Sequence, residues 1–191
     1  ISKIQSIGNG PGEYLSIFSF EIIPDEKCIE ILDGNLKKIF KYSYNGNFIN
    51  YKSIPFRARL FSHLNDNYIF SKQLFYENEI FGYQIVTTDS NIAIKNKYIK
   101  VDKKTSIGIS QGNQISKTKD GLLFLPINSV VAYQLKKDTI QPKYYFNFKE
   151  HWDEDVFYKK FNHPKDLINA LDKKKIISGL GVTETKGFLL I

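Results

Sequence analysis

Apolar runs of strand length alternate with turn residues along the first third of the chain. Proline presets φ for a reversal at Pro24, and glycine tolerates the positive φ of tight turns at Gly34 and Gly46. The pair Asn45-Gly46 is a strong hairpin signal. The segments between the turns favour β-structure because they are rich in isoleucine, phenylalanine and tyrosine. The pattern predicts four antiparallel strands, at residues 18–23, 28–33, 37–44 and 47–54.

The same order of strands and turns recurs twice. The second unit has predicted strands at 57–64, 68–74, 81–88 and 92–101, and the third has them at 114–118, 122–126, 130–136 and 139–148. The turns before the fourth strands, at Gly46, Asn91 and Asp138, lie 45 and 47 residues apart. This period is typical of β-propeller blades, whereas a β-sandwich has turns every 8–12 residues or so without a longer period. The predicted fold class is all-β, a propeller with four-stranded antiparallel blades at 16–54, 57–101 and 112–149.

The remaining segments predict parts of blades and a helical insertion. Residues 1–7 are expected to form the outermost strand of a preceding blade, and residues 176–183 and 188–191 the first two strands of a following one. Between 150 and 175, apolar residues at spacings of three and four predict two short helices, at 155–161 and 164–171. We therefore expect residues 1–191 to be one partial propeller domain of about three and a half blades, with the remaining blades supplied by the rest of the chain or by another subunit.

The sequence also resembles a known family. The strings that carry the resemblance are GNGPGEYLSI (8–17), EILDGNLKKIFKYSYNGNFI (30–49) and SIPF (53–56). They look like the six-bladed β-propeller family common in Bacteroidetes, which is similar to the NHL-repeat propellers, and the resemblance covers most of residues 1–149. It implies a six-bladed ring in a bacterial protein outside the cytoplasm, either periplasmic or a lipoprotein at the cell surface. It carries no catalytic motif onto this chain.

Composition and charge narrow the possible classes. A hydrophobic content of 42% suits a chain with a substantial core, and no apolar run approaches the roughly 20 residues that span a bilayer. The net charge of +7 comes from lysines scattered through strands and turns, so no concentrated nucleic-acid-binding surface is expected. The single cysteine, Cys28, lies in a predicted strand and is expected to be a buried, unreactive thiol.

Arg57 and Arg59 are the candidate ligand-binding residues. They are the only arginines and alternate along one predicted strand, so their side chains are expected on one face. That strand is the first of its unit, which lines the central channel of a propeller. Two guanidinium groups there can hold a carboxylate or phosphate of a ligand. The other interpretation, which we favour narrowly, is that they form salt bridges with neighbouring strands and only stabilise the fold.

Histidines and carboxylates give no recognisable catalytic or metal-binding pattern. His63, His151 and His163 are far apart and lack the spacing of metal-binding motifs. The carboxylates at 153–155 follow His151, but acidic residues at a predicted helix start are favoured by the helix dipole. We predict no catalytic residue, no metal site and no cofactor.

The glycine-rich segment before the first strand could suggest a phosphate-binding loop through Gly8, Gly10 and Gly12. Pro11 lacks an amide proton, however, and a strand rather than a helix follows. We therefore interpret the segment as a connection between blades.

The expected function is a non-catalytic binding or interaction module whose loops and channel mouth hold a protein, peptide or glycan. The alternative is a hydrolase or lyase that uses a divalent metal bound in the channel, as some relatives of the NHL-repeat propellers do. An enzyme needs histidine or carboxylate side chains that converge at the channel, whereas a binding module needs an exposed aromatic or charged patch.

Overall fold

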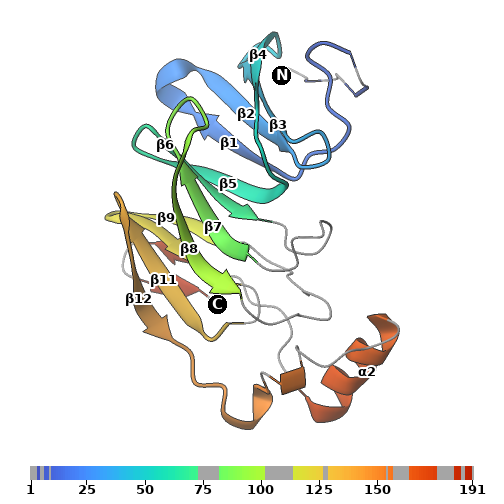
Figure 1. Cartoon of the computed structure of the whole chain (residues 1–191), viewed down its shortest axis with the longest axis vertical. Coiled ribbons are helices and arrows are strands. Elements are labelled where there is room, and N and C mark those ends of the chain that lie inside the picture. The colour runs from blue at the N-terminus through green and yellow to red at the C-terminus, as the bar shows by residue number, and fades with distance from the viewer. Residues whose placement is uncertain are drawn as a thin grey trace. The chain divides into compact units, whose positions relative to one another are not determined.

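The computed structural model describes residues 4, 7, 8, 10–72, 82–101, 114–126, 129–153, 155, 156, 164–175, 183–185 and 188–190. They belong to two compact units. The first unit comprises Ile1–Gln73 and Ile85–Lys97, and the second comprises Leu74–Gln84 and Tyr98–Ile191. Both units are built mainly of strands (Figure 1).

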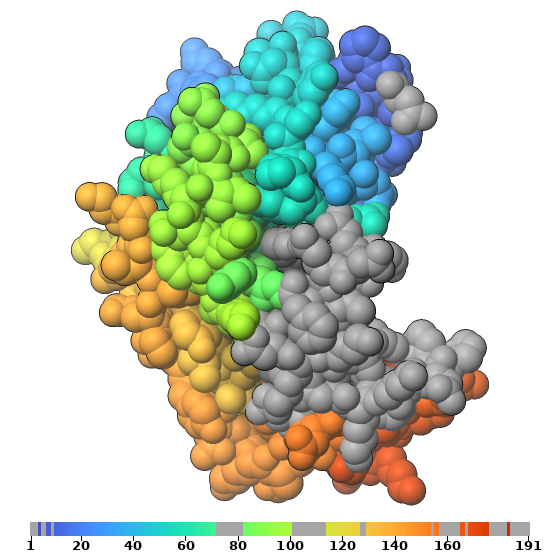
Figure 2. Space-filling view, in the orientation of Figure 1, coloured from blue at the N-terminus to red at the C-terminus, as the bar shows by residue number. Residues whose placement is uncertain are grey.

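Blade 1 is a four-stranded antiparallel sheet in the first unit, with the strand order β1-β2-β3-β4. Its strands are β1 (Ser19–Ile23), β2 (Cys28–Asp33), β3 (Lys38–Ser43) and β4 (Phe48–Ser53). The predicted turn at Pro24 is a single 3-10 turn, η1 (Pro24–Glu26), and Gly46 has a φ of 83° between β3 and β4. The outer strand β4 is largely exposed (cyan, top of Figure 2). The prediction of a four-stranded sheet within 16–54 is confirmed.

Two more sheets have the same four-stranded plan. Blade 2 consists of β5 (Ala58–Leu64), β6 (Asn67–Lys72), β7 (Gly82–Thr88) and β8 (Ile94–Val101). Blade 3 consists of β9 (Ile115–Thr118), β10 (Gly121–Phe124), β11 (Val131–Lys136) and β12 (Thr139–Tyr145). In both sheets, strands that are neighbours in sequence are also neighbours in the sheet. The predicted fold class, a partial β-propeller with a helical segment, is confirmed.

Short helices and a hairpin follow blade 3. After a 3-10 turn, η2 (Lys149–His151), helix α2 (Pro164–Lys174) begins at the predicted proline and extends past the predicted end at residue 171. The hairpin pairs β13 (Thr183–Thr185) with β14 (Phe188–Leu190), so its first strand ends two residues later than predicted. The predicted strand at 1–7 and helix at 155–161 lie mostly outside the described residues. In the described part of the chain, no helix has the length and apolar character needed to cross a membrane.

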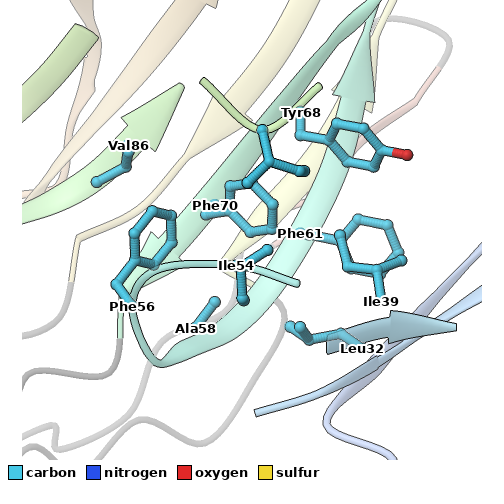
Figure 3. Packing of buried hydrophobic residues seen from close by; sticks show 10 residues of the cluster. Leu32, Ile39, Ile54, Phe56, Ala58, Phe61, Tyr68, Phe70 and Val86 are labelled. Carbon is cyan, nitrogen blue, oxygen red and sulfur yellow. The ribbon is translucent and has the colours of Figure 1, made fainter. Parts of the chain in front are cut away.

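A hydrophobic cluster joins blade 1 to blade 2 within the first unit. Leu32 and Ile39 of blade 1 pack with Phe61 and Phe70 of blade 2 (Figure 3). The rings of Phe61 and Phe70 are stacked, with centroids 6.4 Å apart. The hydroxyl of Tyr68, at the edge of the cluster, points away from these apolar side chains (Figure 3). A buried phenol needs a polar partner, and this one finds it in blade 1.

Candidate functional site

The carboxylate of Asp33, at the end of β2, is fully buried and organises the loops beside it. Its Oδ2 accepts hydrogen bonds from the backbone amides of Leu15 (2.7 Å) and Ser16 (2.9 Å). Its Oδ1 accepts hydrogen bonds from the amides of Asn35 (2.8 Å) and Leu36 (2.9 Å). These four amides replace the water that a carboxylate otherwise binds. Asp33 therefore fixes the segment before β1 against the turn between β2 and β3.

Polar side chains extend this network outwards to form what we call the loop rim, which consists of Ser16, Asn35 and Arg57. The side-chain amide of Asn35 donates a hydrogen bond to Ser16 Oγ at 3.0 Å, and the guanidinium of Arg57 donates one to Asn35 Oδ1. Asn35 is exposed, whereas Ser16 and Arg57 are half-buried. The loop rim thus joins three connections: the segment before β1, the β2–β3 turn and the β4–β5 connection.

The two arginines do not occupy regularly alternating positions of one strand. β5 begins at Ala58, so Arg57 lies in the connection before it. The register shifts between Ala58 and Leu60, which places Arg59 at a bulge or irregularity. A bulge interrupts the simple alternation of side chains on which the expectation of a shared face rests. A ligand-binding role for Arg57 and Arg59 therefore remains a prediction.

A second buried carboxylate, that of Glu30 in β2, links blade 1 to blade 2. Its Oε1 accepts a hydrogen bond from the hydroxyl of Tyr68 at 3.0 Å, and its Oε2 lies 2.9 Å from Nε2 of His63. His63 and Tyr68 are paired across β5 and β6, with ring centroids 4.4 Å apart. The Lys52 amine donates a hydrogen bond to the Tyr68 hydroxyl at 3.1 Å. We call Glu30, Lys52, His63 and Tyr68 the seam cluster.

The seam cluster has the residue types of an acid–base site, but its surroundings favour a structural role. Burial, together with the charge and hydrogen bond of Glu30, raises the pKa of Tyr68 far above its usual range. The phenol therefore stays protonated and serves as a donor rather than as a nucleophile. Glu30 and Tyr68 are each only 2% exposed, so their polar atoms are shielded from a substrate. The cluster holds the two blades together.

The glycine-rich segment folds around a carboxylate of its own. The amide of Gly10 donates a hydrogen bond to Glu13 Oε2 at 2.8 Å. Gly12 has a φ of 77°, and its carbonyl oxygen accepts a hydrogen bond from the Tyr42 hydroxyl at 2.7 Å. An amide that a phosphate would require is thus bonded to an internal anion. These contacts support the structural interpretation of the segment.

Charged groups around His151 form polar contacts with neighbouring residues of the second unit. The Lys174 amine donates a hydrogen bond to Asp153 at 2.7 Å, and this bond lowers the pKa of Asp153. Asp153 also accepts a hydrogen bond from the amide of Asp155 at 3.1 Å, and His151 Nδ1 lies 3.2 Å from the Lys175 carbonyl oxygen. Across the described ranges, no group of three or more histidine, cysteine, aspartate or glutamate side chains could hold a metal ion.

Cys28 is fully buried in β2, as predicted. Burial raises the pKa of its thiol because the charged thiolate is poorly solvated there. The reactive thiolate form is correspondingly suppressed.

The structure identifies Glu30, Asp33 and Tyr68, which sequence reasoning missed. One signal was available: Glu30 alternates with Cys28 and Leu32 along its strand, and this spacing places its side chain on the same buried face. A carboxylate in such a layer requires hydrogen-bond partners. Those partners, however, lie 33 and 38 residues away on another blade.

These sheets, with the seam between blades 1 and 2, define a β-propeller domain. The family model for six-bladed β-propellers designated DUF5128 matches residues 1–191, so the chain belongs to this family. The resemblance inferred from the glycine-rich string and the strand pattern is confirmed.

One solved structure adds support for the fold. A protein of Bacteroides fragilis thought to be exported is similar to this chain, with a TM-score of 0.81 and 22% sequence identity. The match covers 97% of this chain and 54% of that one, so this chain spans about half the length of that structure. A DUF4221 family member from Bacteroides vulgatus matches with a TM-score of 0.44 and 11% identity, over 73% of this chain and 46% of that one. At 22% identity the first match supports the fold alone. None of the curated proteins compared matches the chain.

Proposed function

We propose that this propeller is a non-catalytic binding module. The observation that carries the proposal is the contrast between the buried and the outward-reaching polar groups of blades 1 and 2. Glu30 and Asp33 are bonded within the fold, whereas the loop rim continues the Asp33 network to the exposed side chain of Asn35. Buried carboxylates with internal partners stabilise packing, while a polar network at the surface is available to a ligand.

The ligand proposed for the loop rim carries a carboxylate or a phosphate, as part of a protein, peptide or glycan. The guanidinium of Arg57 offers several donors in a planar arrangement that matches such groups. Asn35 positions it, because the Asn35 side chain bonds both Arg57 and Ser16 while its backbone amide bonds Asp33. Arg59 adds a second positive charge nearby in sequence, and the net charge of +7 favours acidic partners.

The alternative, a hydrolase or lyase with a metal in the channel, has no comparable support. In the seam cluster, Glu30 and Tyr68 are buried, and the partly exposed His63 contacts the Glu30 carboxylate. The described histidines, cysteine and carboxylates form no group suited to a metal ion. The proposal is therefore binding without catalysis.

Export to the periplasm or to the cell surface as a lipoprotein is part of the same proposal. The fold similarity to the Bacteroides fragilis protein thought to be exported supports it. Fractionation of the producing cells tests it, since we expect the protein outside the cytoplasmic fraction.

The double substitution Arg57→Gln and Arg59→Gln tests the loop rim as a binding site. Arrays of acidic peptides and glycans provide the probes. We expect the parent to bind an acidic probe less tightly as salt rises, and the variant to lose about tenfold or more in affinity. The matched control is Lys165→Gln with Lys173→Gln, which removes the same charge from exposed positions of α2 and leaves binding unchanged.

Two results would contradict the proposal. Destabilisation of the double arginine variant by about 3–5 kcal/mol, measured by denaturant unfolding, would identify the arginines as a buried salt-bridge anchor. Chemical conversion of a bound probe by the parent protein would show that the propeller is an enzyme.

A further inference from the structure

Strand β4 forms the outer edge of blade 1. The strand order is β1-β2-β3-β4, and no strand among the described residues pairs with the far side of β4. Five of the six residues of β4 are exposed (cyan, top of Figure 2). They include Ile49, which is 48% exposed, and Tyr51, which is 47% exposed. Branched and aromatic side chains of this kind favour strand pairing, so the edge has the composition of a strand that can accept a neighbour.

Backbone groups of β4 point towards this edge. The amide of Ile54 donates a hydrogen bond to the Lys37 carbonyl oxygen at 2.8 Å, so this pair of residues is bonded across the strands β3 and β4. In an antiparallel pair of strands, residues bonded to the partner strand alternate with residues whose backbone groups point away from it. Counted along the register from Ile54, the N–H and C=O groups of Tyr51 and Ser53 point away from β3. These are the groups that an added strand would bond.

The outer strands of the other two blades carry features that discourage pairing. Natural proteins protect strand edges with lysine, proline and irregular backbone. In blade 2, β8 has Lys95, Lys97 and Lys100, and its Ile99 has a positive φ of 58°. In blade 3, β12 contains Pro142, and its register shifts where it pairs with β11.

Strand β4 has fewer of these features. It contains no proline and a single lysine, Lys52. The Lys52 amine is bound within the first unit, since it donates hydrogen bonds to the Tyr68 hydroxyl at 3.1 Å and to the Ser90 carbonyl oxygen at 2.7 Å. One register shift occurs beside Ile49, which leaves residues 50–53 as a regular stretch. Blade 1 therefore has the least protected edge of the three.

The charge of the two outer strands indicates the chemistry of a partner. β3 and β4 contain Lys38, Lys41 and Lys52 and no carboxylate. Lys41 is paired with Glu26, whereas the Lys38 amine lies over the ring of Tyr51, 4.2 Å from its centroid. A second copy of β4 would bring more lysines to this edge without a compensating carboxylate, which is unfavourable. A strand with acidic side chains fits the edge better.

We propose that the outer edge of β4 binds an extended, acidic segment of another protein, which adds to blade 1 as a further strand. The outward backbone groups of Tyr51 and Ser53 supply the hydrogen bonds of this strand addition. Successive residues of a strand point to opposite faces, so an apolar residue of the partner lies beside Tyr51 and an acidic one beside Lys52. The proposal is independent of the loop rim, where side chains of the connections hold the ligand.

Binding of a synthetic peptide tests this proposal. The probe is a capped peptide in which valine alternates with glutamate. One control peptide has lysine in place of glutamate, and the other has N-methyl groups on the valine amides, which removes hydrogen-bond donors but keeps the charge. We expect the parent to bind the probe about tenfold or more tightly than either control, measured by fluorescence polarisation.

A pair of substitutions at Ser53 tests the same point from the side of the protein. Ser53→Pro removes an outward N–H without removing a hydrogen bond to β3, whereas Ser53→Ala keeps the N–H. We expect the proline variant to bind the probe about tenfold or more weakly than the parent and the alanine variant to bind it equally well. Melting temperatures show whether both variants remain folded. If the proline variant is unfolded, the N-methylated peptide decides the question on the parent.

Several results would overturn the proposal. These are no detectable binding of the probe to the parent, equal binding of the N-methylated peptide, and equal binding of the lysine peptide. Binding lost in the Arg57→Gln, Arg59→Gln variant but kept in Ser53→Pro would place the probe at the loop rim, which would overturn this proposal and support the proposed function. A dimer of the parent that Ser53→Pro dissociates in sedimentation would identify a second copy as the partner and overturn it too.

Discussion

At the residue scale, the contacts of blade 1 suggest that Asp33 contributes more to the free energy of unfolding than any other single side chain of this blade. Asp33→Ala removes the acceptor of four backbone amides in the segment before β1 and the β2–β3 turn. We expect the free energy of unfolding to fall by about 3 kcal/mol or more, because buried donors lose their partners. Asp33→Asn should cost less, since the amide keeps one oxygen acceptor. Urea unfolding measures both.

The control for Asp33 is Asp120→Ala. The Asp120 side chain is exposed, and its contact with the Lys136 amine is long, at 4.0 Å. Its removal should change the free energy of unfolding by about 0.5 kcal/mol at most. Equal effects of the two alanine substitutions would show that Asp33 does not organise the loops.

Gly12 supports a second prediction at this scale. Its φ of 77° is costly for other residues, and a Cβ would lie 2.5 Å from Cγ of Phe48. We expect Gly12→Val to lower the melting temperature by several degrees, corresponding to about 1–3 kcal/mol. Gly12→Ala should cost less in a Phe48→Ala background, because only the backbone strain then remains. Lost ligand binding with an unchanged melting temperature would mean that the segment is a ligand site instead.

At the element scale, strand β3 makes the stability of blade 1 depend on pH in the alkaline range. Burial raises the pKa of Tyr42 from 10.0 to about 12. Between these values the folded state binds more protons than the unfolded state, so the free energy of unfolding falls as pH rises. Tyr42→Phe removes this proton linkage. Between pH 10 and pH 12 the variant should therefore lose less stability than the parent. At pH 10 the variant should be the less stable of the two, because it lacks the hydrogen bond from the Tyr42 hydroxyl to the Gly12 carbonyl oxygen.

Denaturant unfolding at several pH values in this range compares the two slopes. The lysines titrate in both proteins and cancel in the comparison. Parallel slopes would mean that Tyr42 ionises as easily in the folded state as in the unfolded state.

The strands of the three blades could be predicted because their signals are local. Proline and glycine mark turns such as those at Pro24 and Gly46 within a few residues of the strands that they join. The irregular start of β5 could not be predicted in this way, since its register depends on pairing with β6. For that reason, the regular alternation of side chains that was assumed for Arg57 and Arg59 is not found in the structure.

At the scale of the whole molecule, the period of the repeat predicted the propeller, but the polar site between blades was not predicted. Glu30 is recognisable in sequence as a carboxylate on a buried strand face, but His63 lies far from the other histidines and fits no metal-binding spacing. Their contact depends on how one blade packs on the next, which no short-range pattern encodes. Sequence patterns therefore specify the blades, and the packing of the blades specifies which polar groups meet.

A double-mutant cycle on Glu30→Ala and His63→Ala tests most directly whether the buried polar groups hold blades 1 and 2 together. The free energy of unfolding is measured for the parent, both single variants and the double variant. We predict a coupling energy of about 1–3 kcal/mol, because the Glu30 carboxylate and the His63 ring are in contact across the two blades. Additivity within about 0.5 kcal/mol would contradict a structural role for the seam cluster.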